Sequence, residues 1–190
     1  MVSQLTTQIP PEEYLELERK SESKNEYLKG EVFAMTGASL RHNLIVVNIV
    51  AELKQQLKQT GCKVVASDMR VGAPGATLYT YPDVVVFCGE PQLEDKQFDT
   101  LLNPCLIVEV LSKSTAAYDQ EIKFGYYRTI ESLTEYLLVA QDEYHVAQHT
   151  RQPDGRWLLT DYRSPEDSLR LEAIGCLLSL KEIYDNVTTS

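Results

Sequence analysis

Apolar residues recur along the chain with two different periods, and the longer period predicts helices. Every third or fourth position between residues 40 and 59 is apolar, which predicts a long helix with one buried stripe. Gly61 follows this stretch and is expected to end the helix. Two further helices are predicted over residues 12–19 and 116–130. The stripe of the long helix is expected to consist of Val46, Val50, Leu53 and Leu57.

Shorter apolar runs, separated by turn residues, predict strands. Residues 83–87 and 105–111 are apolar almost throughout, which is typical of central strands buried on both faces. A hairpin is predicted over residues 26–34, because Gly30 at its middle adopts the positive φ of a tight turn. Further strands are expected at residues 63–66, 69–71, 135–139, 144–149 and 157–162. These elements predict an α/β fold with a mixed β-sheet core flanked by helices.

The composition predicts one domain. A chain of 190 residues with 43% hydrophobic content can bury a full core without a metal or a disulfide. The domain is expected to span residues 10–186, with residues 1–9 and 187–190 as flexible ends. No apolar run approaches the length that crosses a bilayer, and the first residues lack both a basic and an apolar targeting segment. A cytoplasmic protein with no membrane segment is therefore expected.

The cysteines do not form a recognisable framework. None belongs to a CxxC pair, and the three histidines lie in no cysteine cluster, so a structural zinc site has no support. Buried free thiols are expected instead. The four cysteines are Cys62, Cys88, Cys105 and Cys176.

The formal net charge of −10 narrows the possible nucleic-acid functions. A protein that coats nucleic acid without sequence preference needs Lys and Arg to contact phosphates, so this charge argues against such a protein. It is compatible with a nuclease, because an acidic metal site adds negative charge that bound cations offset.

Asp83 and Glu109 are the candidate functional residues, because each is a single acid in an otherwise apolar strand. An ionised carboxylate inside a sheet costs several kcal/mol unless it is paired or bound to a cation. Two such acids on neighbouring strands predict a site for Mg²⁺, or for Mn²⁺, since both prefer oxygen ligands and bind phosphate oxygens. The structural alternatives are a capping role for Asp83 and a neighbouring Tyr or Arg that satisfies Glu109.

Several segments resemble the Uma-two family of restriction endonucleases, within the PD-(D/E)XK nuclease superfamily. The resemblance covers nearly the whole chain. It implies a restriction-endonuclease-like fold, with Pro82-Asp83 as the PD element and Glu109 as the second acid, both of them binding Mg²⁺. The segments are EYLKGEVFAMTGAS followed by His42, SDMRV, YPDVVVFCGEP, NPCLIVEVLSKSTAAYDQEIKFGYY and YLLVAQDEYHVAQHTRQPDGRWLLTDY.

The sequence departs from the superfamily pattern at the lysine. Leu111 occupies that position, and leucine cannot stabilise a developing negative charge. Lys123 is the first candidate to replace it, because the following helix can direct a side chain back toward the end of the Glu109 strand. Lys113 is the second. The alternative for Lys123 is an exposed ion pair with Asp119, four residues earlier on the same helix.

Other polar residues near these motifs have two interpretations each. Glu31 is either a third acid of the site or a solvent-facing strand residue. His42 either orients a water or contacts a phosphate, or it is a polar residue at the start of a helix. Asp68 is expected to pair with Arg70. A set of residues at helical spacing is expected to be core rather than base-stacking: Tyr118, Ile122, Tyr126 and Tyr127.

The sequence and the resemblance together predict an Mg²⁺-dependent endonuclease that hydrolyses phosphodiester bonds of nucleic acid, with DNA the expected substrate. Homodimerisation is expected because paired nucleases cut both strands. The alternative is a catalytically degenerate protein of the same fold with a binding or regulatory role. A glycoside hydrolase with two carboxylates is disfavoured, since aromatic residues are only 8% of the chain and no aromatic sugar cleft is evident.

Overall fold

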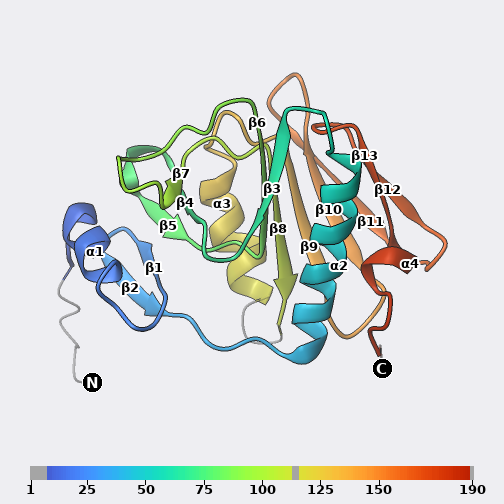
Figure 1. The fold of residues 1–190 in the computed structure, drawn as a ribbon, viewed down its shortest axis with the longest axis horizontal. Helices are drawn as coiled ribbons and strands as arrows, with labels where there is room; N and C mark the ends of the chain where they lie inside the picture. The colour runs from blue at the N-terminus through green and yellow to red at the C-terminus, as the bar shows by residue number, and fades with distance from the viewer. Residues whose placement is uncertain (1–7, 113–115, 189–190) are drawn as a thin grey trace.

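The structure is a computed structural model that describes residues 8–112 and 116–188. A six-stranded sheet lies at its centre, with the strand order β11-β10-β9-β8-β6-β3 (Figure 1). Strands β8 and β9 are parallel and the other neighbours are antiparallel, as a mixed sheet requires. The strands are β3 (Cys62–Ala66), β6 (Val84–Cys88), β8 (Leu106–Leu111), β9 (Glu135–Ala140), β10 (Val146–Arg151) and β11 (Trp157–Tyr162).

A second sheet packs beside the first and begins with the predicted hairpin. Its strand order is β2-β1-β5-β4-β7, so β2 is an edge strand. Lys29 and Gly30 at the hairpin turn both have positive φ, of 46° and 97°, which is the geometry of a two-residue turn. The strands are β1 (Asn25–Leu28), β2 (Glu31–Ala34), β4 (Arg70–Gly72), β5 (Leu78–Thr80) and β7 (Thr100–Leu101).

The long helix α2 (Leu40–Gln56) covers one face of the central sheet. Ser39 caps it, because its hydroxyl accepts a hydrogen bond from the backbone N–H of His42 at 3.1 Å. The predicted stripe is partly wrong. Leu53 and Leu57 are buried, whereas Val46 and Val50 are only half-buried, and Ile45 and Ile49 occupy the buried positions instead.

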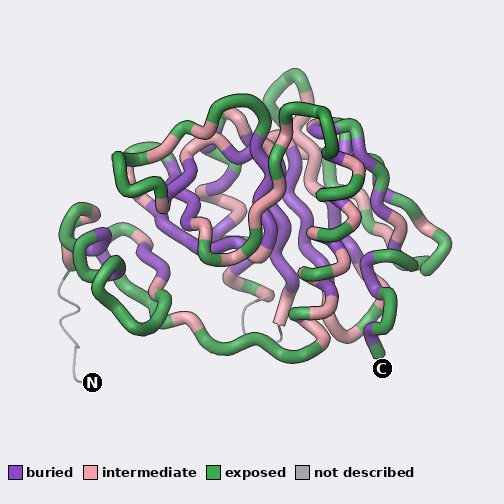
Figure 2. The backbone as a smooth tube through the Cα atoms, viewed as in Figure 1, coloured by how far each residue is buried: buried purple, intermediate pink, exposed green. Residues whose placement is uncertain are grey.

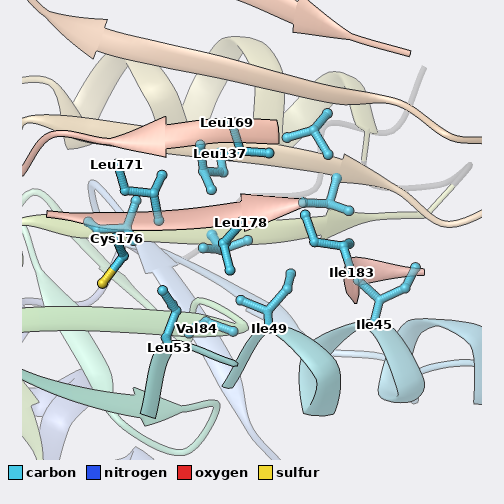
Figure 3. Close-up of a cluster of buried hydrophobic side chains, with 14 of the residues drawn as sticks. Ile45, Ile49, Leu53, Val84, Leu137, Leu169, Leu171, Cys176, Leu178 and Ile183 are labelled. Carbon is cyan, nitrogen blue, oxygen red and sulfur yellow. The ribbon is translucent and has the colours of Figure 1, made fainter. Parts of the chain in front are cut away.

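The stripe is displaced because a third, two-stranded sheet also packs on α2. Strands β12 (Ser168–Leu171) and β13 (Cys176–Ser179) and helix α4 (Leu180–Ile183) were not predicted from the sequence. They add Leu169, Leu178 and other apolar side chains to the core between α2 and the sheet (Figure 3). Figure 2 shows that burial is greatest along the central strands.

The helix predicted over residues 116–130 has two parts. A π-helical segment η2 (Tyr118–Lys123) leads into a short α-helix α3 (Phe124–Tyr127). π-Helical turns are rare and often mark functional sites. The remaining helices are α1 (Pro11–Glu18) and η1 (Pro74–Ala76). Among the described residues, no helix has both the length and the apolar character that crossing a membrane requires.

The cysteine prediction is wrong for two of the four residues. Cys62 and Cys88 form a disulfide between β3 and β6, and the Sγ of Cys105 lies 3.7 Å from that of Cys88. Cys62 and Cys88 are directly opposed in the register of β3 and β6, which brings their side chains together. Residues far apart in the sequence thus become neighbours by strand pairing. Cys105 and Cys176 are free thiols, and Cys176 is buried.

Two residues of the predicted flexible ends belong to the packed structure. The backbone N–H of Ile9 donates to the carbonyl oxygen of Gly30, and Val187 is buried in the core beside α2. Residues 1–7 and 189–190 lie outside the described residues.

Candidate active site

Asp83 and Glu109 are held close together by the pairing of β6 with β8. Val84 is opposite Val108 in the antiparallel register, so the residue before β6 lies beside position 109. The backbone N–H of Val110 donates a hydrogen bond of 2.7 Å to Asp83 Oδ2. This bond fixes the Asp83 carboxylate against the strand that carries Glu109.

Glu109 points away from α2 into a buried polar cluster. Its side chain is only 5% exposed, and Oε1 accepts hydrogen bonds from the Tyr127 hydroxyl at 3.0 Å and from Lys123 Nζ at 3.2 Å. Burial raises the pKa of Glu109 well above its usual value, and repulsion by neighbouring carboxylates adds to this, while Lys123 opposes it. Glu109 is therefore a carboxyl group whose charged form depends on a nearby cation.

Lys123 supplies a positive charge within this cluster. Its Nζ lies 2.8 Å from Glu26 Oε1, 3.1 Å from Asp119 Oδ1 and 3.2 Å from Glu109 Oε1. Burial alone would lower the pKa of Lys123, but the three carboxylates outweigh it and raise the pKa well above the usual value. Lys123 is thus held as an ammonium. It is not the exposed ion pair of the alternative interpretation, because its side chain is only 7% exposed.

Carboxylates outnumber the ammonium in the described part of the site. Glu26, Asp83, Glu109 and Asp119 all act electrostatically on this centre, and Lys123 is the ammonium that contacts three of them. Such an excess of negative charge in a buried position is unfavourable unless protons or cations balance it. The cluster is therefore suited to bind a cation.

His42 contacts the other oxygen of Asp83. Its Nε2 lies 2.9 Å from Asp83 Oδ1, and both side chains are mostly buried. Burial would lower the pKa of His42, but the hydrogen bond and the charge of Asp83 outweigh it, so the pKa is raised. The first turn of α2 thus places an imidazole at the site.

The donor chemistry fits a hard divalent cation. Carboxylate oxygens of Asp83 and Glu109 are the ligands that Mg²⁺ and Mn²⁺ prefer in proteins. Within the described residues, however, no three His, Cys, Asp or Glu side chains are gathered as a ready set of ligands. Lys123, Tyr127 and the Val110 amide hydrogen-bond to these oxygens instead. An ion at this place would have to compete with those contacts.

The structure brings to the site an acid, Glu26, that the sequence did not single out. Glu31 lies on the exposed edge strand β2, and the contact with Lys123 is made by Glu26 of β1 instead. Glu26 faces the same side of the hairpin as Glu31, because Leu28 is opposite Glu31 and lies two residues from Glu26. The alternation within the hairpin could have indicated Glu26. Lys113 lies outside the described residues.

Arg70 does not pair with Asp68. Arg70 is buried, and its guanidinium contacts Asp99 at 2.9 Å and the Tyr81 hydroxyl at 2.8 Å. Asp68 is exposed and pairs with Lys24. The reason is that Asp68 belongs to the turn before β4, whereas Arg70 within β4 points inward.

The aromatic residues after β8 have different positions. Tyr127 is fully buried, as predicted, and Tyr126 is half-buried. Ile122 is 43% exposed, so its prediction as a core residue is wrong. Tyr118 is half-buried, with its ring centroid 5.5 Å from Lys123 Nζ. The π-helical turn changes which residues face inward, because its period is longer than that of an α-helix.

Comparison with a solved structure defines the class of fold. The crystal structure of "a putative nuclease belonging to DUF820" from Anabaena variabilis ATCC 29413 matches with a TM-score of 0.76, over 95% of this chain and 99% of that chain. The two sequences are 18% identical, so the likeness concerns the fold. The fold is that of the restriction-endonuclease-like nucleases.

The family follows from the sequence. The family model Uma2, described as "Putative restriction endonuclease", matches residues 11–181, and the chain belongs to this family. Two proteins of Synechocystis sp. (strain ATCC 27184 / PCC 6803 / Kazusa), both described as uncharacterized, are similar over most of their length. The protein sll1609 is 38% identical over 161 residues, covering 85% of this chain and 91% of its own length. The protein slr1290 is 36% identical over 176 residues, covering 93% and 91%.

Proposed function

We propose that this chain is an Mg²⁺-dependent endonuclease that hydrolyses phosphodiester bonds of nucleic acid, with DNA as the expected substrate. The observation that carries the proposal is the buried contact of Lys123 with Glu109, beside Asp83, in a cluster with excess negative charge. Membership of a family of nuclease fold supports it.

Asp83 and Glu109 would hold the ion, because the pairing of β6 with β8 places these two hard oxygen donors at opposed positions. Mg²⁺ or Mn²⁺, when bound, would lower the pKa of a water molecule and polarise the scissile phosphate. His42 would hold the orientation of the Asp83 carboxylate through its hydrogen bond.

Lys123 would replace the lysine of the superfamily motif, whose position is occupied by Leu111 in this chain. Its ammonium is in contact with Glu109 and is kept protonated by its neighbours, so it can stabilise negative charge that develops on a phosphate. Glu26 and Asp119 would position Lys123. A lysine on η2 rather than on strand β8 is compatible with this role, because its ammonium still contacts Glu109, the second acid of the motif.

A catalytically degenerate protein of the same fold, with a binding or regulatory role, is the second candidate. The observation that favours it is the engagement of Lys123 by three carboxylates, which already neutralises part of the site without any ion. A homodimer and a cytoplasmic location remain expectations; a homodimer would place two sites on a duplex.

The test is cleavage of single-stranded DNA, duplex DNA and RNA of mixed sequence, with Mg²⁺ or with Mn²⁺. The variants are Asp83→Asn, Glu109→Gln and Lys123→Met. The matched control is Glu135→Gln, since Glu135 is an equally buried strand glutamate that bonds Gln148 rather than the acid cluster. The proposal expects cleavage by the native chain and the control only. Cleavage by Asp83→Asn or by Glu109→Gln would contradict it. If neither the native chain nor any variant cleaves a substrate, the degenerate candidate is favoured.

A further inference from the structure

An exposed aromatic side chain lies directly beside the acid cluster. Phe33 of β2 is opposite Glu26 in the register of the hairpin, and opposed residues of antiparallel strands project from the same face with Cβ atoms about 5 Å apart. Glu26 Oε1 is 2.8 Å from Lys123 Nζ. Phe33 therefore belongs to the face of the hairpin that borders the site.

Phe33 is 41% exposed, which is not explained by packing within the chain. It lies on an edge strand whose four residues are all exposed. Val32 is similarly exposed, at 44%, but it is opposite Tyr27 and so faces the other side of the hairpin, where Tyr27 is buried. The two large apolar residues exposed on β2 thus lie on different faces, and only the face of Phe33 borders the acids.

Tyr118 extends the aromatic surface toward the catalytic residues. Its ring centroid is 6.3 Å from that of Phe33, with the planes tilted by 46°. The same ring centroid lies 5.5 Å from Lys123 Nζ. The Tyr118 hydroxyl is buried and has no hydrogen-bond partner within the described residues. Tyr118 therefore lies close both to Lys123 and to the exposed ring of Phe33.

We propose that Phe33 and Tyr118 form a stacking site for an unpaired nucleobase of the substrate, so that single-stranded nucleic acid, or a single-stranded part of a duplex, is the preferred substrate class. This inference rests on the proposed nuclease function. A protein ring can stack on a base only when the base is free of its own stack, which is the case in single strands.

The charge of the chain supports stacking as a source of affinity. The 28 Asp and Glu residues outnumber the 18 Lys and Arg residues, which disfavours the phosphate contacts that dominate duplex binding. Stacking of bases on aromatic side chains does not depend on sequence or on counterion release, so it can supply affinity that phosphate contacts here do not. The phosphate beside such a base would lie toward Lys123 and the acids.

The experiment measures binding of a single-stranded oligonucleotide that contains 2-aminopurine, and of the matching duplex, in Ca²⁺ buffer. Anisotropy gives the Kd, and quenching of 2-aminopurine reports stacking. The variants are Phe33→Ala, Phe33→Trp and, as the matched control, Val32→Ala. We expect Phe33→Ala to weaken single-strand binding about tenfold and to remove the quenching, whereas Phe33→Trp and Val32→Ala retain both.

Equal affinity of Phe33→Ala and Val32→Ala, or duplex binding as tight as single-strand binding, would overturn the stacking site. If cleavage still requires Asp83 and Glu109 in that case, only this inference fails. If the native chain neither binds nor cuts nucleic acid, the proposed function fails as well.

Sedimentation of the same variants tests whether a second copy of the chain, rather than a nucleobase, covers Phe33. A dimer that both Phe33→Ala and Val32→Ala dissociate would make the edge strand a protein interface and contradict the proposal.

Discussion

At the end of β8, the two faces of the central sheet bury very different side chains, although the same strand contributes to both. On the face toward α2, Val108 and Val110 of β8 pack in an apolar core. On the opposite face, Glu109, which lies between them in the sequence, contacts Lys123 and Tyr127. Successive residues of a strand point to opposite faces of the sheet. A shift of one residue along β8 therefore separates an apolar core side chain from one in the charged cluster.

The difference teaches how a buried charge is tolerated in a small domain. Where β8 faces α2, stability comes from apolar burial, which needs no partner of defined charge. The charged end of the other face depends on Lys123, because its three contacting carboxylates would be buried charges without a partner if the ammonium were removed. The following predictions separate these two sources of stability.

The largest effect is expected for Lys123→Met. The substitution leaves Glu26, Glu109 and Asp119 buried without their ammonium, and the free energy of unfolding should fall by about 3–5 kcal/mol at neutral pH. Urea denaturation measures it, with the exposed Lys181→Met as control. A loss no larger than that of the control would contradict a stabilising role for this ion cluster.

The same variant should show a characteristic pH dependence. The pKa of Glu109 is raised in the folded state, so folded Glu109 binds a proton at pH values where the unfolded chain has lost it. Stability therefore rises as pH falls through the folded pKa toward the unfolded value, and falls as pH increases. Removing Lys123, which lowers this pKa, should strengthen the trend. Stability that does not change as the pH rises above the pKa of an unfolded glutamate, about 4.3, would contradict it.

On the apolar face, Leu53→Ala should cost about 2–5 kcal/mol through lost burial and a residual cavity, because Leu53 is fully buried between α2 and the sheet. The control is Val47→Ala on the same helix, where the side chain is 62% exposed. Urea denaturation at two pH values completes the comparison. We expect the cost of Leu53→Ala to be the same at both, and a pH-dependent cost would show that the two faces are not independent.

The far end of β6 offers a third comparison. Asp83 precedes this strand, and Cys88 at its other end is bonded to Cys62. Titration of the unfolded oxidised chain should find two reactive thiols, and reduction should lower the free energy of unfolding by about 2–4 kcal/mol. In Cys88→Ser, reductant should no longer change stability. Four reactive thiols without reductant would contradict the bond.

The smallest effect is expected for Tyr127→Phe. The hydroxyl of Tyr127 bonds both Glu109 and Thr80, so its removal leaves buried oxygens with one partner fewer and should cost about 1–2 kcal/mol. The matched control is Tyr162→Phe, whose hydroxyl bonds Gln148 away from the acid cluster. A cost much above 3 kcal/mol would mean that Tyr127 has a larger role in holding Glu109 than one hydrogen bond explains.

Local patterns in the sequence predicted the central strands and the hairpin well. Apolar runs indicated β6 and β8, and Gly30 indicated the turn, because each depends on a few adjacent residues. The unpredicted strands β12 and β13 are short, and their burial depends on α2, which lies far away in the sequence. The same reason explains the disulfide between Cys62 and Cys88, which strand register brings together.

The candidate site was predictable where an acid interrupts an apolar strand. Asp83 and Glu109 stand out in this way, and the structure places them side by side. Glu26 did not stand out, because its strand has only four residues and is not a long apolar run that an acid would interrupt. The position of Lys123 depends on the π-helical geometry of η2, which no periodicity in the sequence indicated.

The most direct test of the account is calorimetry of Mn²⁺ binding to the native chain, Asp83→Asn, Glu109→Gln and the control Glu135→Gln. The account predicts that the native chain and the control bind the ion, and that each site variant loses binding while keeping a free energy of unfolding equal to or above that of the native chain, since a buried charge is removed. Equal Mn²⁺ binding by all four proteins, or no binding by any, would contradict a cation site at Asp83 and Glu109.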